Sequence, residues 1–121
     1  MSAAIVIAAA LQTLTLDWNA LPPVPFRAPP IVTPDMASFV GREVRLRNCP
    51  VATPGPLQVD VAVMVGEGGD IRTVVPRAIQ CPSVEQYAAA LVAGFARNNL
   101  LPRPGASEQW YRATLSFDWT K

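Results

Sequence analysis

The sequence contains no histidine. The side chain that most often acts as a general base near neutral pH, and that most often binds metal ions, is therefore missing. Neither a Ser-His-Asp nor a Cys-His catalytic arrangement can be assembled within the chain. The carboxylates Asp60, Glu67, Asp70 and Glu85 fall in a predicted strand, a turn and a helix cap, and their spacing pairs no acid with a base. The sequence predicts a protein that is not an enzyme and that uses no cofactor.

An excess of charge of one sign is also lacking. Ten basic and nine acidic residues give a net charge of +1, and only 16% of the 121 residues are charged. No strong field is then available to attract phosphates, anionic lipids or acidic ligands. We therefore expect no nucleic acid among the partners. The length of the chain is that of one globular domain.

Cysteine is scarce, with Cys49 and Cys81 as the two residues of this type. Two cysteines are too few for a structural zinc site, and this pair is too far apart for a C-x-x-C redox motif. The sequence predicts no metal site. The pair is either two buried thiols or a disulfide, which would stabilise the fold by about 3 to 4 kcal/mol. We favour the disulfide, provided that the protein is exported.

No apolar run is long enough for a membrane-spanning anchor. Residues 3–11 are uninterrupted apolar residues, but a helix that crosses a bilayer needs roughly 20 of them. The small residues Ala8 and Ala10 suit cleavage by signal peptidase. We predict that residues 1–20 are a signal peptide. The alternative is an N-terminal apolar segment that forms a buried strand or helix of the domain.

Proline, in contrast, is abundant, with 13 residues in the chain. Residues 21–34 read Leu-Pro-Pro-Val-Pro-Phe-Arg-Ala-Pro-Pro-Ile-Val-Thr-Pro, a density that precludes a helix or a central strand. We predict an extended polyproline-II-like spacer, and the alternative is a ligand for an aromatic groove of another protein. Residues 35–121 would then form the folded domain. Its first part, residues 35–47, fits either a short helix leading into a strand or a strand throughout.

A hairpin is the clearest pattern in the chain. Residues 57–65 place an apolar side chain at every second position, and Gly66-Glu67-Gly68-Gly69-Asp70 separates them from Ile71-Arg72-Thr73-Val74-Val75. Strict alternation predicts a strand with one face on a core, and the glycines supply the backbone angles of a tight reversal. The segment predicts two antiparallel strands.

One helix and one further strand follow. Ser83-Val84-Glu85-Gln86 is a capping-box pattern, apolar residues then recur at spacings of three and four through Phe95, and Gly94 indicates close packing on a sheet. Residues 109–119 alternate again. The sequence thus predicts an α+β, two-layer ββαβ fold with one helix on a three-stranded antiparallel sheet. The predicted core is Val59, Val61, Val63, Ile71, Val74, Tyr87, Leu91, Phe95, Leu115 and Phe117.

Several of these pieces occur in the order of a known family. They are the Val-x-Val-x-Val strand, the glycine turn, the helix with Tyr87-Ala88-Ala89-Ala90-Leu91, the loop Arg103-Pro104-Gly105 and the closing Thr-Leu-Ser-Phe-Asp-Trp strand. Between residues 44 and 119 the chain resembles a TonB C-terminal domain. The resemblance implies a ββαβ domain in the periplasm of a Gram-negative cell. It also implies that the last strand offers its edge to a short peptide of an outer-membrane transporter, by strand addition.

Carried onto this sequence, the resemblance places the binding edge at residues 109–118, with Trp110, Arg112, Thr114 and Ser116 as the binding residues. It implies a protein partner, an outer-membrane TonB-dependent receptor. A long open edge also predicts a homodimer through this strand. The function it implies is a non-catalytic periplasmic module that binds an extended peptide or a partner strand. The alternative is an energy-transducing TonB protein, tethered to the inner membrane, for TonB-dependent outer-membrane transport.

Overall fold

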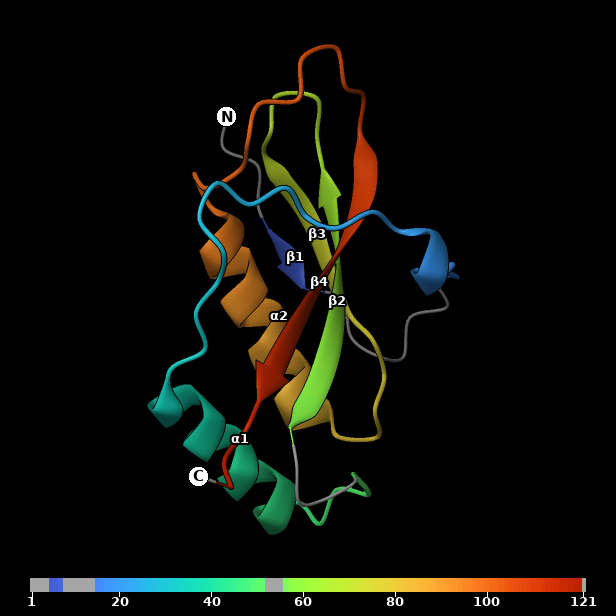
Figure 1. Cartoon of the computed structure of the whole chain (residues 1–121). Helices are drawn as coiled ribbons and strands as arrows, with labels where there is room; N and C mark the ends of the chain where they lie inside the picture. Colours follow the sequence, from blue (N-terminus) through green and yellow to red (C-terminus); the bar gives the residue numbers. More distant parts are fainter. Residues whose placement is uncertain (1–4, 8–14, 52–55, 121) are drawn as a thin grey trace.

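The computed structural model describes residues 5–7, 15–51 and 56–120. Along the chain lie β1 (Val6–Ile7), the 3-10 helix η1 (Trp18–Ala20), α1 (Pro34–Leu46), β2 (Leu57–Val65), β3 (Ile71–Pro76), α2 (Pro82–Ala96) and β4 (Gln109–Phe117) (Figure 1). The predicted signal-peptidase site at Ala8 and Ala10 lies outside the described residues. Cleavage of residues 1–20 stays a prediction. Within these residues β1 pairs with β3, and Leu16 and Trp18 pack on the domain.

The strands form one sheet in the order β1-β3-β2-β4. The central strand β2 is antiparallel to both neighbours, and its Val63 pairs with Val74 on β3 and with Tyr111 on β4. The order β2-β3-α2-β4 confirms the predicted α+β fold, with a three-stranded antiparallel sheet and a helix packed on it. The short β1 adds a parallel strand at the far edge of β3, where Val6 pairs with Thr73.

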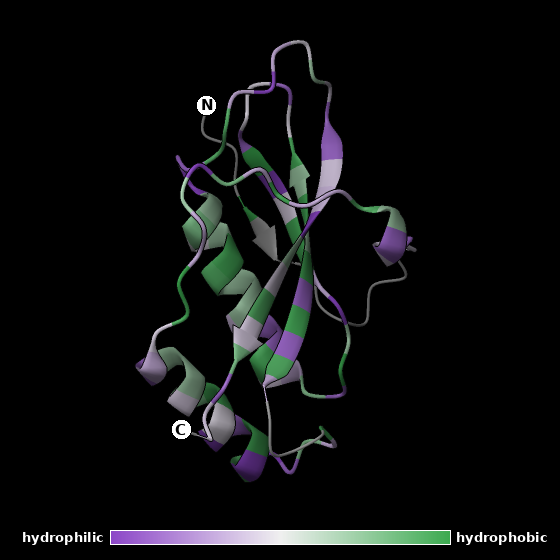
Figure 2. Cartoon of the chain, in the orientation of Figure 1, coloured by the Kyte–Doolittle hydropathy of each residue, from purple (hydrophilic) through white to green (hydrophobic). Residues whose placement is uncertain are grey.

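The hairpin has the alternation that its sequence predicts. Val59, Val61 and Val63 are fully buried, and apolar and polar residues alternate along the first part of β2, where Gln58 and Asp60 lie (Figure 2). In the turn, the Gly66 N–H donates to the Asp70 C=O at 2.8 Å. Gly69 has a φ of +85°, in the left-handed region that favours glycine. The glycines therefore close the reversal as expected.

The helix α2 begins two residues earlier than the capping-box pattern predicts, at Pro82 rather than Val84. Its N-cap is Cys81, with no side-chain cap, and Pro82 occupies the first turn. The buried Glu85 carboxylate reaches back instead, and its Oε2 accepts the N–H groups of Cys81 at 3.0 Å and Ile79 at 2.9 Å. The prediction of Ser83 as the cap is wrong, because a carboxylate one turn inside the helix satisfies the backbone ahead of it.

The face of α2 that meets the sheet is made of small side chains. Ala88, Ala89 and Val92 are fully buried, whereas the predicted core residues Tyr87, Leu91 and Phe95 are only partly buried along one flank. Gly94 is exposed, so the prediction that it packs closely on the sheet is wrong. Alanine brings a helix close to a sheet without a glycine, and the larger apolar side chains then lie at the margin.

Residues 35–47, for which the sequence left a helix or a strand open, lie almost entirely in the helix α1 (Pro34–Leu46). The Thr33 hydroxyl accepts the N–H of Met36 at 3.2 Å, and Pro34 occupies the first turn. After α1 the chain reaches Cys49, which forms a disulfide with Cys81, 32 residues further along the sequence. The predicted disulfide is confirmed, and it ties the end of α1 to the start of α2.

Two helical glycines, Gly41 and Gly94, provide a matched test of how Trp119 packs on α1. A Cβ on Gly41 of α1 would lie 2.5 Å from Cγ of Trp119, whereas a Cβ on Gly94 of α2 would meet nothing within 4 Å. We expect Gly41→Ala to lower the free energy of unfolding by about 1 to 3 kcal/mol, because the indole must move. We expect Gly94→Ala to raise it by about 0.5 to 1 kcal/mol. Urea unfolding measures both values, and equal effects would show that Trp119 does not lie on α1.

The proline-rich residues 21–33, which we call the strap, lie on the domain. They are extended, as the proline density predicts, but the segment does not stand apart as a spacer. Val24 is 6% exposed and belongs to the main core, and Phe26 forms an isolated bridge with Leu100. Figure 1 shows the strap crossing in front of the sheet and then descending to α1. An apolar residue between prolines anchors it.

Candidate binding edge of β4

Strand β4 is outermost on its side of the sheet, so one of its backbone edges faces away from β2. In an antiparallel pair, alternate residues direct their N–H and C=O groups toward the neighbour and away from it. Arg112 bonds the strap with both groups and therefore points away from β2. Thr114 and Ser116 share this orientation by alternation. Among the described residues, neither has a backbone partner on the outer edge.

Arg112 is fully engaged by the strap and by the chain just before it. Its N–H donates to the C=O of Pro22 at 2.8 Å, and its C=O accepts the N–H of Val24 at 3.0 Å. Its side chain donates from Nη1 to the C=O of Trp18 at 3.1 Å. The structure therefore places Arg112, predicted as a binding residue, against its own chain.

Trp110 is also covered from within the chain. It packs with Leu16, Trp18 and Leu21 against a second, small apolar cluster on the face of the sheet opposite α2. That cluster is centred on Ala62, which is fully buried. The indole of Trp110 thus contributes to internal packing, and the structure divides the four predicted binding residues into a covered pair and an open pair.

Thr114 and Ser116 form the open pair, and both are exposed. The Thr114 hydroxyl donates to Oδ1 of Asp60 at 2.6 Å, and the other oxygen of Asp60 accepts a hydrogen bond from Arg77 at 3.1 Å. The Arg77 guanidinium lies 5.5 Å from the ring centroid of Trp18. The Thr114 hydroxyl is thus already bonded to the Asp60 carboxylate. The groups that the edge presents for binding are the backbone N–H and C=O groups of Thr114 and Ser116.

A small cavity of about 230 Å³ borders the end of this open stretch. Its lining comes from the end of β4 and the residues just after it, from the start of α1 and from the two residues before that helix. It includes Ser116, Trp119, Val32, Pro34 and Ala37. The cavity marks where the open edge ends against α1. The open stretch of β4 therefore lies between the strap at Arg112 and the first turn of α1.

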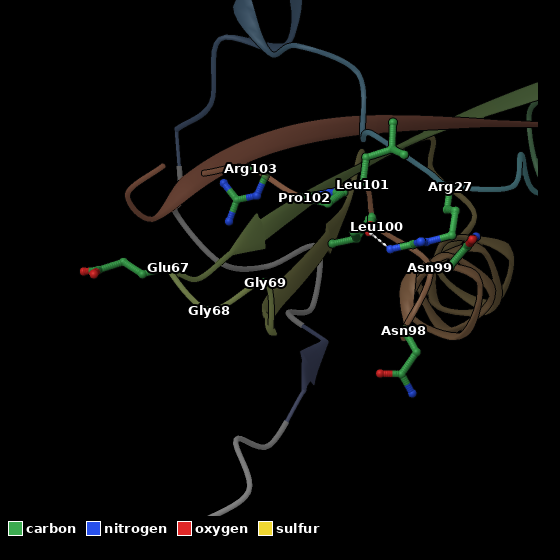
Figure 3. A pocket seen from close by; sticks show the side chains of 10 residues that line it. All are labelled: Arg27, Glu67, Gly68, Gly69, Asn98, Asn99, Leu100, Leu101, Pro102 and Arg103. Atoms are coloured by element: carbon green, nitrogen blue, oxygen red, sulfur yellow. Dashed lines mark hydrogen bonds between the residues drawn. The ribbon is translucent and has the colours of Figure 1, made fainter. Parts of the chain in front are cut away.

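A larger cavity, of about 410 Å³, lies at the other end of the molecule, between the hairpin turn and the loop after α2 (Figure 3). Two arginines line it. Arg27 donates to the C=O of Leu100 at 3.3 Å, and Arg103 donates to the C=O of Gly66 at 2.6 Å and to the Tyr111 hydroxyl at 2.9 Å. Because their donors bond loop carbonyls and a tyrosine, these guanidinium groups hold the loops in place.

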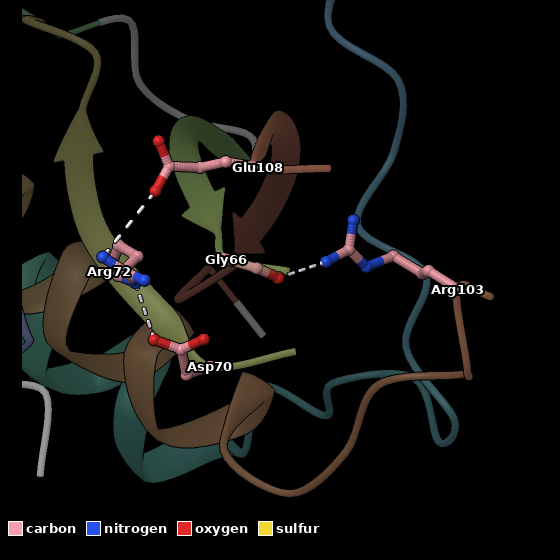
Figure 4. A network of polar contacts seen from close by, with 5 residues as sticks. All are labelled: Gly66, Asp70, Arg72, Arg103 and Glu108. Atoms are coloured by element: carbon pink, nitrogen blue, oxygen red, sulfur yellow. Dashed lines mark hydrogen bonds and ion pairs between the residues drawn. The ribbon is translucent and has the colours of Figure 1, made fainter. Parts of the chain in front are cut away.

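Charged side chains next to this cavity form a surface network (Figure 4). Arg72 contacts Asp70 at 2.7 Å and Glu108 at 3.7 Å, and all three side chains are about half exposed. Exposed pairs of this kind contribute little to stability. The network joins the hairpin to the residue just before β4.

The part of the chain that the structure describes contains no helix long and apolar enough to cross a membrane. Those same residues bring together no group of three or more histidine, cysteine or acidic side chains that could hold a metal ion. No family model matches the chain, and no curated protein or solved structure is significantly similar to it. The open backbone groups of Thr114 and Ser116 are therefore the strongest indication of function in the structure.

Sequence patterns locate β4 and its alternation but miss the residues that cover half of its edge. Pro22 and Val24 bond Arg112 although they lie about 90 residues earlier in the sequence, and no local pattern reports such a contact. The available signals are the apolar residues Val24 and Phe26, because burial of such side chains stabilises docking of the segment on the domain.

Proposed function

We propose that this chain is a non-catalytic binding module that accepts an extended segment of a partner protein onto the open edge of β4. The observation that carries the proposal is the outward backbone of Thr114 and Ser116, which has no partner among the described residues. In strand addition, main-chain hydrogen bonds supply the affinity and alternate side chains supply the selectivity.

The chemistry of the open stretch supports this proposal. Exposed sheet edges are usually protected by lysine, proline, bulges or a covering segment, because unpaired strands attract other chains. The strap protects Arg112 in this way, but Thr114 and Ser116 are small, neutral and exposed. An exposed edge of this kind is what strand addition requires.

We further propose that the module works in the periplasm of a Gram-negative cell. The Cys49–Cys81 disulfide supports an oxidising compartment, because disulfides persist outside the cytosol. The order β2-β3-α2-β4 is also that of the TonB C-terminal domains that the sequence resembles. The partner proposed on this basis is a peptide segment of an outer-membrane TonB-dependent receptor.

Proline at position 114 tests the proposal. The N–H of Thr114 points away from β2, so Thr114→Pro removes an outward donor without removing a bond of the β2–β4 ladder. We expect the variant to recover at least about tenfold less partner from an outer-membrane extract, since a donor is lost and the ring obstructs pairing. Thr114→Ala is the matched control, because it keeps the N–H and should retain capture.

Circular dichroism and thermal unfolding of the two variants show whether Thr114→Pro remains folded. Equal recovery of every partner by both folded variants would contradict the proposal. Sedimentation of the isolated protein tests the second occupant, another copy of this chain. A dimer that Thr114→Pro dissociates would show that the edge pairs with itself rather than with a receptor.

A further inference from the structure

The strap turns away from β4 directly after Val24, whose N–H bonds Arg112. To continue along the edge, it would present the C=O of Val24 and the N–H of Phe26 to Thr114. Those two groups bond each other instead, at 2.9 Å, in a three-residue turn around Pro25. The strap therefore pairs with a single residue of β4, and the groups that would have covered Thr114 are already used.

Further contacts hold this turn in place. The N–H of Leu101 donates to the C=O of Pro25 at 2.8 Å, and the N–H of Arg27 donates to the C=O of Asn99 at 2.7 Å. The side chain of Asn99 bonds Ala28 in both directions, at 2.9 and 2.8 Å. The strap is thus bonded to the loop after α2 on one side of the turn and to β4 on the other.

Proline also prevents the strap from pairing more widely. Pro22 and Pro23 have no N–H, so of the residues 22–24 only Val24 can donate to the edge. Its N–H goes to Arg112, and its side chain is buried in the core. The buried Val24 side chain therefore fixes the register of the two hydrogen bonds between the strap and Arg112.

We infer that residues 22–24 of the strap are a built-in stop, which limits the partner to a short extended segment that pairs with Thr114 and Ser116 and ends against Val24. This inference rests on the proposed function and names the length and register of the segment. A partner strand that pairs along all of β4 must displace the strap from Arg112. The same holds for a second copy that pairs along the whole strand.

Two synthetic probes test the stop on the full chain. They are a capped Thr-Val-Thr-Val tetrapeptide and its doubled octapeptide, which have alternating side chains and good strand propensity. Binding is followed by amide chemical shifts and by amide exchange at Arg112, Thr114 and Ser116. In the wild type, we expect the two probes to bind with affinities within about twofold, to protect Thr114 and Ser116, and to leave Arg112 unchanged.

Val24→Pro removes both the donor and the buried anchor of the strap. In this variant we expect the octapeptide to bind about tenfold more tightly and to protect Arg112, with the tetrapeptide unchanged. Val24→Ala, which keeps the N–H, should show a smaller gain and serves if Val24→Pro does not fold. Ile31→Ala is the matched control, because this side chain is 73% exposed in the strap.

The outcomes separate the stop from the proposed function. If the octapeptide binds the wild type several-fold more tightly than the tetrapeptide and protects Arg112, residues 22–24 do not limit the bound segment. The proposed binding at the edge of β4 would remain supported. The stop is also wrong if neither Val24 variant changes the ratio of the two affinities. If neither probe alters Thr114 or Ser116 in any variant, edge binding itself is contradicted, and the stop falls with it.

Discussion

Replacing Cys49 and Cys81 together with alanine is expected to lower the free energy of unfolding by about 3 to 4 kcal/mol. The disulfide closes a loop between residues 32 apart in sequence, and opening it returns that loop's conformational freedom to the unfolded chain. Cys81 is also fully buried, so its replacement removes packed atoms from the start of α2. Because small domains have only about 5 to 15 kcal/mol of stability, this loss is a large share of the total.

Urea unfolding followed by tryptophan fluorescence measures the effect. A reductant should bring the wild type close to the double alanine variant and should leave the variant itself unchanged. If the free energy of unfolding of the double variant lay within about 1 kcal/mol of that of the oxidised wild type, the expectation would be contradicted. A disulfide that closes this loop restricts the unfolded chain, so its loss must lower the stability by more than that.

Phe117→Ala is expected to lower the free energy of unfolding by about 3 to 5 kcal/mol. The Phe117 side chain is fully buried at the end of β4, and its ring centroid lies 6.4 Å from that of Tyr87 on α2. Alanine would leave a cavity where β4 meets the helix. The neighbouring Ser116→Ala is the matched control, with an expected change within about 0.5 kcal/mol, because Ser116 is exposed.

The pair of variants also tests the register of β4, measured again by urea unfolding. A shift by one residue would exchange the buried and exposed faces of the strand. Similar losses for Phe117→Ala and Ser116→Ala would contradict the observed register. The outward orientation of Thr114 depends on that register.

The strands and α2 could be predicted because their signals are local. Alternation places Val59, Val61 and Leu115 on one face, and that face is the buried one. The preference of α2 for small residues at its contact with the sheet could not be predicted. Tyr87 and Phe95 are larger and fit the same helical spacing, and only the distance between helix and sheet decides which stripe is buried.

The covered half of the site depends on contacts between residues distant in sequence. Trp18 and Arg112 are 94 residues apart, and their hydrogen bond is part of what divides β4 into a closed and an open stretch. The alternation of β4 correctly groups Trp110, Arg112, Thr114 and Ser116 on one face. Which of these residues is open depends on the strap, whose extended backbone is predictable from proline but whose docking position is not.

Amide hydrogen exchange at Thr114 and Ser116, with and without a captured partner, tests the central claim most directly. In the free protein we expect both amides to exchange at least about tenfold faster than that of Arg112, because the strap bonds only Arg112. When the partner binds, both amides should become strongly protected while Arg112 stays as it was. A partner that binds tightly and leaves both amides unprotected would contradict strand addition to β4.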